Sequence, residues 1–405
     1  MSLIIQKFGG SSVADAHHLL NVAKKVTKAY SDGNDIVVVV SAQGDTTDKM
    51  LENLKNINKN PSKRELDAYI SCGEQMSASL LAMTIQNLGF NAISLTGWQA
   101  KIFTDSYYGD AEILNIIPER IREELSKKNI VVIAGFQGID EENNISTLGR
   151  GGSDTSAVAL AAALNADKCK IYTDVDGVYT ADPRIVSSAK KIDEISYDEM
   201  FALSKYGAQV LHDKSILTAK KNNVKVEVLS SMLSNSTGTT VKNVENNRAN
   251  PISGIAVLNH IAKITITDIC DKSVFYDSIF PEFKKSGIDV DTSFSTVEKK
   301  QNNFIVFAVD ETKLESCIKL LKQYFLEKDN IFYDKNKSII STIALSDTIN
   351  INIASIIFEI LEEIKINVEM ITCDDKRVSI LIPSASMHSA LNAIHSKLFE
   401  EDILL

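Results

Sequence analysis

The chain has 405 residues, 44% of them hydrophobic and 24% charged, which is enough for two or three domains with a sizeable core. Its formal net charge of −10 argues against a nucleic-acid-binding surface, because such surfaces carry a clustered basic excess. No apolar run approaches the roughly 18 residues of a membrane-spanning helix, and the first residues do not have the basic and apolar regions of a signal peptide.

The five cysteines stand at wide and irregular spacings. They fit neither a zinc site, which needs closely spaced ligands, nor a disulfide framework. Unpaired thiols are typical of a reducing compartment, so the sequence predicts a cytoplasmic protein.

Strand and helix signals alternate from residue 3 to residue 231. Strands are predicted for the apolar runs at 3–8, 35–40, 92–95, 130–138, 169–174 and 224–231, and helices near 12–31, 64–88, 118–128 and 155–166. Apolar strands without alternation, separated by helices, indicate a parallel sheet covered by helices on both faces. The fold class predicted for this part is therefore α/β.

The polar, Asn-rich stretch at 243–251 reads as a linker, and an internal repeat follows it. Residues 283–296 (FKKSGIDVDTSFST) align without gaps with residues 361–374 (LEEIKINVEMITCD), and each copy continues into a strand and a further helix. Two small βαββαβ units are predicted, at 250–330 and 331–405, with residues 252–260 as a candidate first strand of the second. Such small units bury too little surface alone, so we expect their sheets to pair with each other or across subunits.

The first chemistry-bearing stretch is KFGGSSVAD at 7–15, where a strand should pass into a helix. Gly9 and Gly10 allow a ligand to approach the backbone, the following helix would present N–H groups to an anion, and Lys7 adds a charge suited to phosphate. The stretch matches neither the P-loop nor the dinucleotide-binding glycine pattern. Taken alone, it is equally consistent with a purely structural turn.

The second stretch is TLGRGGSDT at 147–155. Arg150 lies among three glycines, a position from which a guanidinium could grip a carboxylate, and Ser153–Thr155 are expected to supply N-cap chemistry to the helix that follows. The alternative is that Asp154 only caps the helix while Arg150 faces solvent.

The third stretch is IYTDVDGVYTADPR at 171–184, an acidic loop after a strand. It does not match an EF-hand, because Ile185 stands where the bidentate glutamate belongs. A nucleotide contact at the carboxyl end of a parallel strand is the functional reading, and a plain acidic turn is the alternative. Two smaller pieces are Ser41 with Thr46 and Thr47 after another strand, and Glu74 just after Gly73 in an otherwise apolar helix.

Together these stretches resemble the aspartate kinases, of the monofunctional type with a paired regulatory tail. The motifs K-F-G-G-S-S, S-A-x-G-x-T-T-D, C-G-E, L-G-R-G-G-S-D-T and T-D-V-D-G-V-Y-T-A-D-P-R occur in the family's order and at its spacing. The resemblance implies an amino-acid-kinase catalytic domain over 1–245 followed by two ACT-like units. It also implies phosphorylation of the L-aspartate β-carboxylate by ATP with Mg²⁺, the entry step to lysine, threonine and methionine synthesis.

The resemblance also implies roles for individual residues. The catalytic set is Lys7, Gly9, Gly10 and Asp154. The aspartate-binding set is Ser41, Thr47, Glu74, Arg150, Gly151, Gly152, Ser153 and Asp154. The nucleotide-binding set is Lys7, Phe8, Gly9, Gly10, Thr173, Asp174, Tyr179, Asp182, Arg184 and Gln209, with Mg²⁺ carried by ATP and no direct metal ligand from the chain.

The chain departs from the family pattern at several positions. GAQVLHD places Gln209 where the family has a nucleotide-contacting lysine and Asp213 where it has a proline. The tail has DKSV at 271–274 instead of D-K-P-G. The candidate effector residues are Asp271, Ser273 and Val274 in this stretch, together with Asn367 and Val368 in the second copy of the repeat. Lysine or threonine is the effector that the resemblance implies.

Two alternatives to an aspartate kinase remain open from the sequence. One is another enzyme of the same fold acting on glutamate, acetylglutamate or UMP, and the other is a catalytically silent amino-acid sensor. In each case the paired tail predicts at least a homodimer through the ACT-like units, because an isolated small sheet leaves an open edge.

Overall fold

The computed structural model describes residues 2–208, 210–233, 237–244, 251–267, 275–288, 290–299, 302–324, 330–344, 350–374 and 376–400. The chain forms two compact units. Unit 1 comprises Met1–Tyr179, Lys191–Lys205 and Gln209–Glu245, and unit 2 comprises Thr180–Lys190, Tyr206–Ala208 and Asn246–Leu405.

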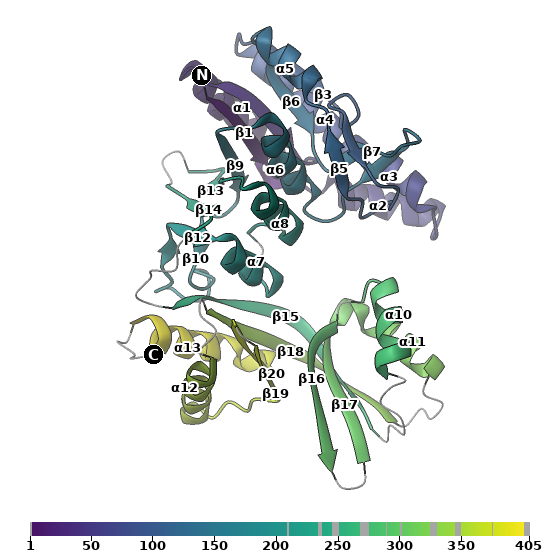
Figure 1. Cartoon of the computed structure of the whole chain (residues 1–405), viewed down its shortest axis with the longest axis vertical. Helices are drawn as coiled ribbons and strands as arrows, with labels where there is room; N and C mark the ends of the chain where they lie inside the picture. Colours follow the sequence, from purple (N-terminus) through teal and green to yellow (C-terminus); the bar gives the residue numbers. More distant parts are fainter. Residues whose placement is uncertain are drawn as a thin grey trace. The chain divides into compact units, whose positions relative to one another are not determined.

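Unit 1 is built on an eight-stranded sheet in the order β12-β14-β13-β9-β1-β2-β6-β3 (Figure 1). Its strands are β1 (Leu3–Phe8), β2 (Asp35–Val40), β3 (Ala92–Leu95), β6 (Ile130–Ala134), β9 (Lys168–Thr173), β12 (Glu194–Ser196), β13 (Val226–Ser230) and β14 (Thr239–Lys242). Neighbouring strands run parallel except for the antiparallel pair β13–β14. The predicted α/β class with a mainly parallel sheet is confirmed.

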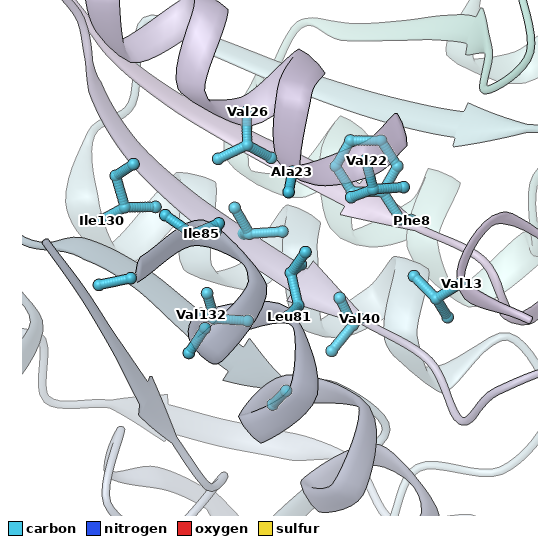
Figure 2. Close-up of a cluster of buried hydrophobic side chains, with 14 of the residues drawn as sticks. Phe8, Val13, Val22, Ala23, Val26, Val40, Leu81, Ile85, Ile130 and Val132 are labelled. Atoms are coloured by element: carbon cyan, nitrogen blue, oxygen red, sulfur yellow. The ribbon is translucent and has the colours of Figure 1, made fainter. Parts of the chain in front are cut away.

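Helices α1 (Ala16–Ser31) and α4 (Cys72–Asn87) pack on one face of this sheet. Figure 2 shows the cluster that they form, in which Val22 and Val26 of α1 and Leu81 and Ile85 of α4 gather with strand residues including Val40. Each such buried side chain contributes roughly 1.5–3 kcal/mol of stability relative to an exposed one. Because side chains alternate along a strand, the intervening residues of β1 and β2 face the other side, which α6 (Gly152–Leu164) contacts.

The remaining elements of unit 1 are a second sheet, a pair of short strands and several helices. A four-stranded sheet, in the order β5-β4-β7-β8, contains β4 (Ile102–Thr104), β5 (Ile113–Ile116), β7 (Gln137–Ile139) and β8 (Ile145–Thr147). The strands β10 (Val178–Tyr179) and β11 (Lys191–Ile192) form a separate antiparallel pair. The other helical elements are η1 (Gly10–Val13), α2 (Thr46–Ile57), α3 (Lys63–Ile70), α5 (Glu119–Ser126), α7 (Tyr197–Lys205) and α8 (Asp213–Asn222).

The single helix predicted for 64–88 is instead two helices, α3 and α4, separated at Ser71. At the junction, the Ser71 hydroxyl donates to the Ala68 carbonyl oxygen at 2.9 Å, and the Nε2 atom of Gln137, from the distant strand β7, donates to the Ser71 carbonyl oxygen at 2.8 Å. The break sets the start of α4, and with it the position of Glu74.

Unit 2 contains a six-stranded sheet in the order β16-β17-β15-β18-β20-β19 (Figure 1). Its strands are β15 (Ile252–Ile266), β16 (Val290–Lys299), β17 (Asn302–Asp310), β18 (Ile331–Ala344), β19 (Met370–Asp374) and β20 (Arg377–Pro383). The helical elements are η2 (Phe275–Ile279), α10 (Phe280–Lys285), η3 (Glu311–Lys313), α11 (Leu314–Tyr324), α12 (Asn350–Glu363), η5 (Ser384–Ser386) and α13 (Met387–Glu400). Among the described residues, no helix is long and apolar enough to cross a membrane.

The repeat seen in the sequence corresponds to two halves that share the long strands β15 and β18. The second half of β15 pairs with β17, whereas its first half, from Ile252 to Leu258, pairs with the part of β18 that lies beside β20. Each half has its own apolar core, one around Phe283 and Phe307 and the other around Ile357 and Ile394. Residues Ala181 and Val186 of the Thr180–Lys190 segment belong to the second core.

Candidate active site

The carboxyl ends of β1, β2 and β9 lie side by side at one edge of the unit 1 sheet. Phe8, the last residue of β1, pairs in register with Val40 on β2 and with Tyr172 on β9. The residues that follow these strands therefore meet at that edge: Gly9 and Gly10 after β1, Ser41 after β2, and Thr173 and Asp174 at the end of β9. This is the edge at which parallel α/β sheets bind ligands.

The turn after β1 packs tightly against the loop after β2. The Gly44 N–H donates to the Gly10 carbonyl at 3.0 Å, and a Cβ added at Gly10 would lie 2.7 Å from the carbonyl oxygen of Ala42. Only glycine allows this close approach at position 10. The two loops form one surface, and the predicted Lys7 and Ser41 regions belong to it.

Lys7 and Asp154 form an ion pair, with 2.6 Å between Nζ and Oδ1 and each side chain 12% exposed. Asp154 lies in the first turn of α6, whose N-cap is Gly151, and no side chain caps this helix. The expected N-cap chemistry of Ser153–Thr155 is therefore wrong, because the Asp154 carboxylate is directed to Lys7 instead. The ion pair joins the first strand to the helix that follows the Arg150 turn.

Arg150 is exposed and immediately precedes the left-handed Gly151, whose carbonyl accepts from the Asp154 N–H at 3.0 Å. The structure thus brings Arg150, Gly151, Gly152, Ser153 and Asp154 together in one turn that also reaches Lys7. Among the described residues, no ion pair of Arg150 is formed, so its guanidinium is available to an anionic ligand.

His212 lies against this turn, and the sequence reasoning missed it. A Cβ added at Gly151 would lie 2.2 Å from the His212 side chain, which shows that the imidazole packs directly on the glycine backbone. The Nδ1 atom of His212 is 2.7 Å from Oδ1 of Asp213, the residue that replaces the family's proline. His212 belongs to the GAQVLHD motif, which the sequence analysis considered only for Gln209 and Asp213, so this motif was the signal that could have identified it.

Glu74 is a buried carboxyl, only 4% exposed, next to the loop after β2. Its Oε1 atom accepts from the Ala42 N–H at 3.1 Å, while Oε2 has no hydrogen-bond partner among the described residues. Burial raises the pKa of Glu74 to about 7. A buried carboxylate with one oxygen unpaired is suited to bind a cation such as an ammonium group. Thr47, in the first turn of α2, is half-buried.

The predicted nucleotide contacts in unit 1 lie around the end of β9. Phe8 is fully buried and stacks on Tyr172 with ring centroids 4.6 Å apart, so its side chain belongs to the core. Thr173 Oγ1 donates to the exposed Asp174 at 2.9 Å, and the Tyr179 hydroxyl donates to Asp176 at 2.7 Å. Burial and this acceptor raise the pKa of Tyr179 to about 12.

The other predicted site residues belong to unit 2 or lie outside the described residues. Asp182 and Arg184 belong to unit 2, where their side chains pair with each other at 2.7 Å. Asn367 is exposed and Val368 half-buried in the turn before β19. Four candidate residues lie outside the described residues: Gln209, Asp271, Ser273 and Val274.

The chain matches known families in both parts. Residues 2–230 match the amino acid kinase family and residues 348–398 match an ACT domain. The fold and the site therefore define an enzyme of the amino acid kinase class with an ACT tail.

Similar proteins narrow this class. An aspartokinase of Geobacillus stearothermophilus is 41% identical over 98% of this chain and 97% of its own length, and one of Helicobacter pylori strain J99 is 40% identical over 97% and 98%. The structure of E. coli aspartokinase III in complex with aspartate and ADP matches with a TM-score of 0.80 and 25% identity, covering 98% of this chain and all of that one. The chain belongs to the aspartokinases.

Proposed function

We propose that the chain transfers the γ-phosphoryl group of ATP to the β-carboxylate of L-aspartate at the loop edge of unit 1, giving 4-phospho-L-aspartate. The observation that carries this proposal is the Lys7–Asp154 ion pair, which ties the glycine turn after β1 to the turn that bears Arg150. The solved structure of E. coli aspartokinase III contains aspartate and ADP, the substrate and product expected for such a reaction.

The reaction needs alignment and charge neutralisation more than proton transfer. A β-carboxylate with a pKa of about 4 is already ionised at neutral pH, so it can attack without a general base. Phosphoryl transfer then depends on in-line positioning and on cations around the transferred group. In this proposal, Lys7 and the N–H groups of Gly9 and Gly10 face the phosphates, and Mg²⁺ arrives with ATP as part of the substrate.

Aspartate carries two carboxylates and an ammonium group, and the site offers a partner for each kind of charge. Arg150 would grip a carboxylate in a bidentate manner, and the unpaired Oε2 of Glu74 would accept from the ammonium group. The hydroxyls of Ser41, Thr47 and Ser153 would complete the pocket. Gly151 and Gly152 would bring backbone N–H groups of the α6 N-terminus towards the anionic end of the substrate.

The adenosine and phosphate side is proposed to involve Thr173, Asp174 and Tyr179 in unit 1. Asp182, Arg184 and Gln209 remain proposed contacts by resemblance. Because ATP is supplied in the cytoplasm, we propose that location for the activity.

The test is an assay of the purified chain with ATP and Mg²⁺ against a panel of L-aspartate, L-glutamate, N-acetylglutamate and UMP. Hydroxylamine traps an acyl phosphate as a hydroxamate, so it separates carboxyl phosphorylation from phosphorylation of UMP. Hydroxamate formation with aspartate alone supports the proposal. A preference for another acceptor would indicate a different enzyme of the same fold. Amino-acid binding without any product would indicate a catalytically silent sensor.

We also propose that the ACT tail binds an amino-acid effector, with lysine or threonine as candidates, and that it joins at least two copies of the chain. A second solved structure of E. coli aspartokinase III contains lysine and aspartate, and matches with a TM-score of 0.76. The six-stranded sheet of unit 2 ends in β16 and β19, whose outer edges are candidates for pairing with a second copy. Titrating lysine and threonine, separately and together, during the assay tests the first proposal, and light scattering of the purified chain tests the second.

A further inference from the structure

Asp67 is a buried charged group that the proposed reaction does not use. It lies on α3, its side chain is fully buried, and burial raises its pKa. Three donors surround its carboxylate. The N–H groups of Gly109 and Thr147 reach Oδ2 at 2.9 Å and 2.7 Å, and the Thr147 hydroxyl reaches Oδ1 at 2.9 Å.

These three hydrogen bonds connect segments that are far apart in the sequence. Thr147 is the last residue of β8, and Gly109 lies in the loop between β4 and β5. The two segments also bond directly, because the Ala111 N–H donates to the Thr147 carbonyl at 2.9 Å. An apolar residue would be easier to bury than a carboxylate, so what Asp67 contributes is the fixed geometry of three directed hydrogen bonds.

The segment that Asp67 holds leads directly into the Arg150 turn. Leu148 is buried and its N–H donates to the Phe136 carbonyl at 2.9 Å. At Gly149 an added Cβ would lie 2.5 Å from Oδ1 of Asp110 and 3.1 Å from the Gly109 carbonyl oxygen. The loop that donates to Asp67 therefore also presses against the residue before Arg150.

The backbone on the other side of Arg150 is equally confined. Gly151 packs on His212, and the Lys214 ammonium pairs with the Asp110 carboxylate, so α8 closes the far side of the same turn. Arg150 thus has an exposed side chain on a backbone that is held from both ends. A guanidinium on a preorganised backbone loses less entropy on binding, and its placement controls affinity.

We propose that Asp67 is a positioning residue for Arg150. Its carboxylate fixes the backbone of Thr147–Gly149, the segment that leads into the Arg150 turn, and thereby determines the position of the guanidinium that binds the aspartate carboxylate. The inference rests on the proposed function, since it assigns Arg150 to aspartate binding. Asp67 itself touches neither reactant.

The test compares steady-state kinetics of Asp67→Ala, Thr147→Val and Thr147→Ser with the unaltered chain. Asp67→Ala should raise KM for aspartate by about tenfold or more, the size of effect that a small misplacement of a binding group produces. KM for ATP should change by less than about twofold, because the hydrogen bonds of Asp67 go to Gly109 and Thr147 and the Lys7–Asp154 ion pair is left intact in this variant. Thr147→Val removes one of the three hydrogen bonds without changing shape, and should raise KM for aspartate by a smaller factor. Thr147→Ser retains the hydroxyl and should restore the affinity.

Glu124→Gln is the matched control. Glu124 is another buried carboxyl of unit 1 with several partners, including Lys127 at 3.0 Å and Asn129 at 2.7 Å, but it lies on α5. Its substitution should lower the melting temperature and leave KM for aspartate unchanged. If Asp67→Ala does not fold, the comparison of KM for aspartate between Thr147→Val and Thr147→Ser tests the positioning role on its own.

The outcomes separate this inference from the proposed function. Equal KM values for aspartate in all variants, or a parallel loss of affinity for aspartate and ATP, overturn the positioning role while the unaltered chain still phosphorylates aspartate. An unaltered chain that does not phosphorylate aspartate overturns the proposed function, whatever the variants do.

Discussion

The ammonium group of Lys7 lies 2.6 Å from the carboxylate of Asp154, which joins the first strand of the chain to the first turn of α6. Both side chains are mostly buried, so the pair is less screened than a surface salt bridge. This contact gives Lys7 one defined direction before any substrate arrives. Such preorganisation is what a cation needs in order to stabilise charge that develops during phosphoryl transfer.

Lys7→Ala should therefore lower kcat by roughly 10²- to 10³-fold, the range seen when one preorganised charge-stabilising group is removed. KM for aspartate should change little, because Glu74 and Arg150 remain in place. Initial rates at saturating ATP, with aspartate varied, measure both quantities. Near-normal turnover of the variant would refute the role assigned to Lys7.

A double-mutant cycle separates the contribution of Lys7 from that of its partner. Asp154→Asn should lower kcat by less than Lys7→Ala does, because the ammonium group remains but is no longer held. Adding Asp154→Asn to Lys7→Ala should then have little further effect, since residues that act as a unit are not additive. Full additivity of the two effects on log kcat would show that Asp154 acts independently of Lys7.

Six of the eight strands of the unit 1 sheet were predicted, because runs such as Leu3–Phe8 and Ile130–Ala134 are short, largely apolar and bounded by glycine or polar residues, whereas the short polar strands β12 and β14 were not predicted. Unbroken burial on both faces produces that signal. The division of 64–88 at Ser71 was not predicted, and a side chain from another strand, that of Gln137, contacts the backbone at that position. Local periodicity contains no information about such a contact.

The site shows the same division between local and long-range information. The glycines and charged residues of the Lys7 and Arg150 motifs could be selected from the sequence, because their types and spacing are unusual in a core. The direct contact of Lys7 with Asp154, the burial of Glu74 and the packing of His212 on Gly151 each depend on how distant segments cross at the sheet edge. These contacts are set by tertiary packing, which is why the expected N-cap role of the Ser153–Thr155 segment was wrong.

Glu74 should give the affinity for aspartate a characteristic pH dependence. Its pKa of about 7 means that below this pH the carboxyl of the free enzyme is protonated and neutral, so it no longer attracts an ammonium group. The value of kcat/KM for aspartate should fall by up to about tenfold per pH unit below 7, because it reports the free enzyme. At saturating aspartate, the decrease of kcat should begin at a lower pH than the decrease of kcat/KM. The reason is that a bound ammonium group favours the ionised carboxylate and so lowers the pKa of Glu74 in the complex.

The Glu74→Gln variant tests this assignment. Its kcat/KM for aspartate should be lower than that of the unaltered chain at pH 8 and nearly constant from pH 6 to 8, because the titrating group is absent. Glu65→Gln, which changes an exposed carboxyl on α3, should keep the original profile. A pH dependence that persists in Glu74→Gln would assign the titration to another group.

His395 on α13 should make unit 2 less stable in mild acid. The imidazole is fully buried, its Nε2 atom is 2.9 Å from the Thr180 hydroxyl oxygen, and the neighbouring charged groups are Glu400, 3.7 Å from Nδ1, and Lys190. Burial lowers the pKa of His395 below its ordinary value of 6.5, and the Glu400 carboxylate offsets only part of this shift. As the pH falls through 6.5, the unfolded chain therefore takes up a proton before the folded chain does, and the free energy of unfolding decreases.

Scanning calorimetry between pH 8 and pH 5.5 measures this effect on the transition of unit 2. His395→Gln can keep a hydrogen bond to Thr180 but cannot titrate, so its melting temperature should fall less over this range than that of the unaltered chain. His388→Gln is the matched control, because His388 lies on the same helix with an exposed side chain. Acid-induced losses of equal size in the His395 and His388 variants would mean that the buried imidazole does not govern the acid sensitivity of this unit.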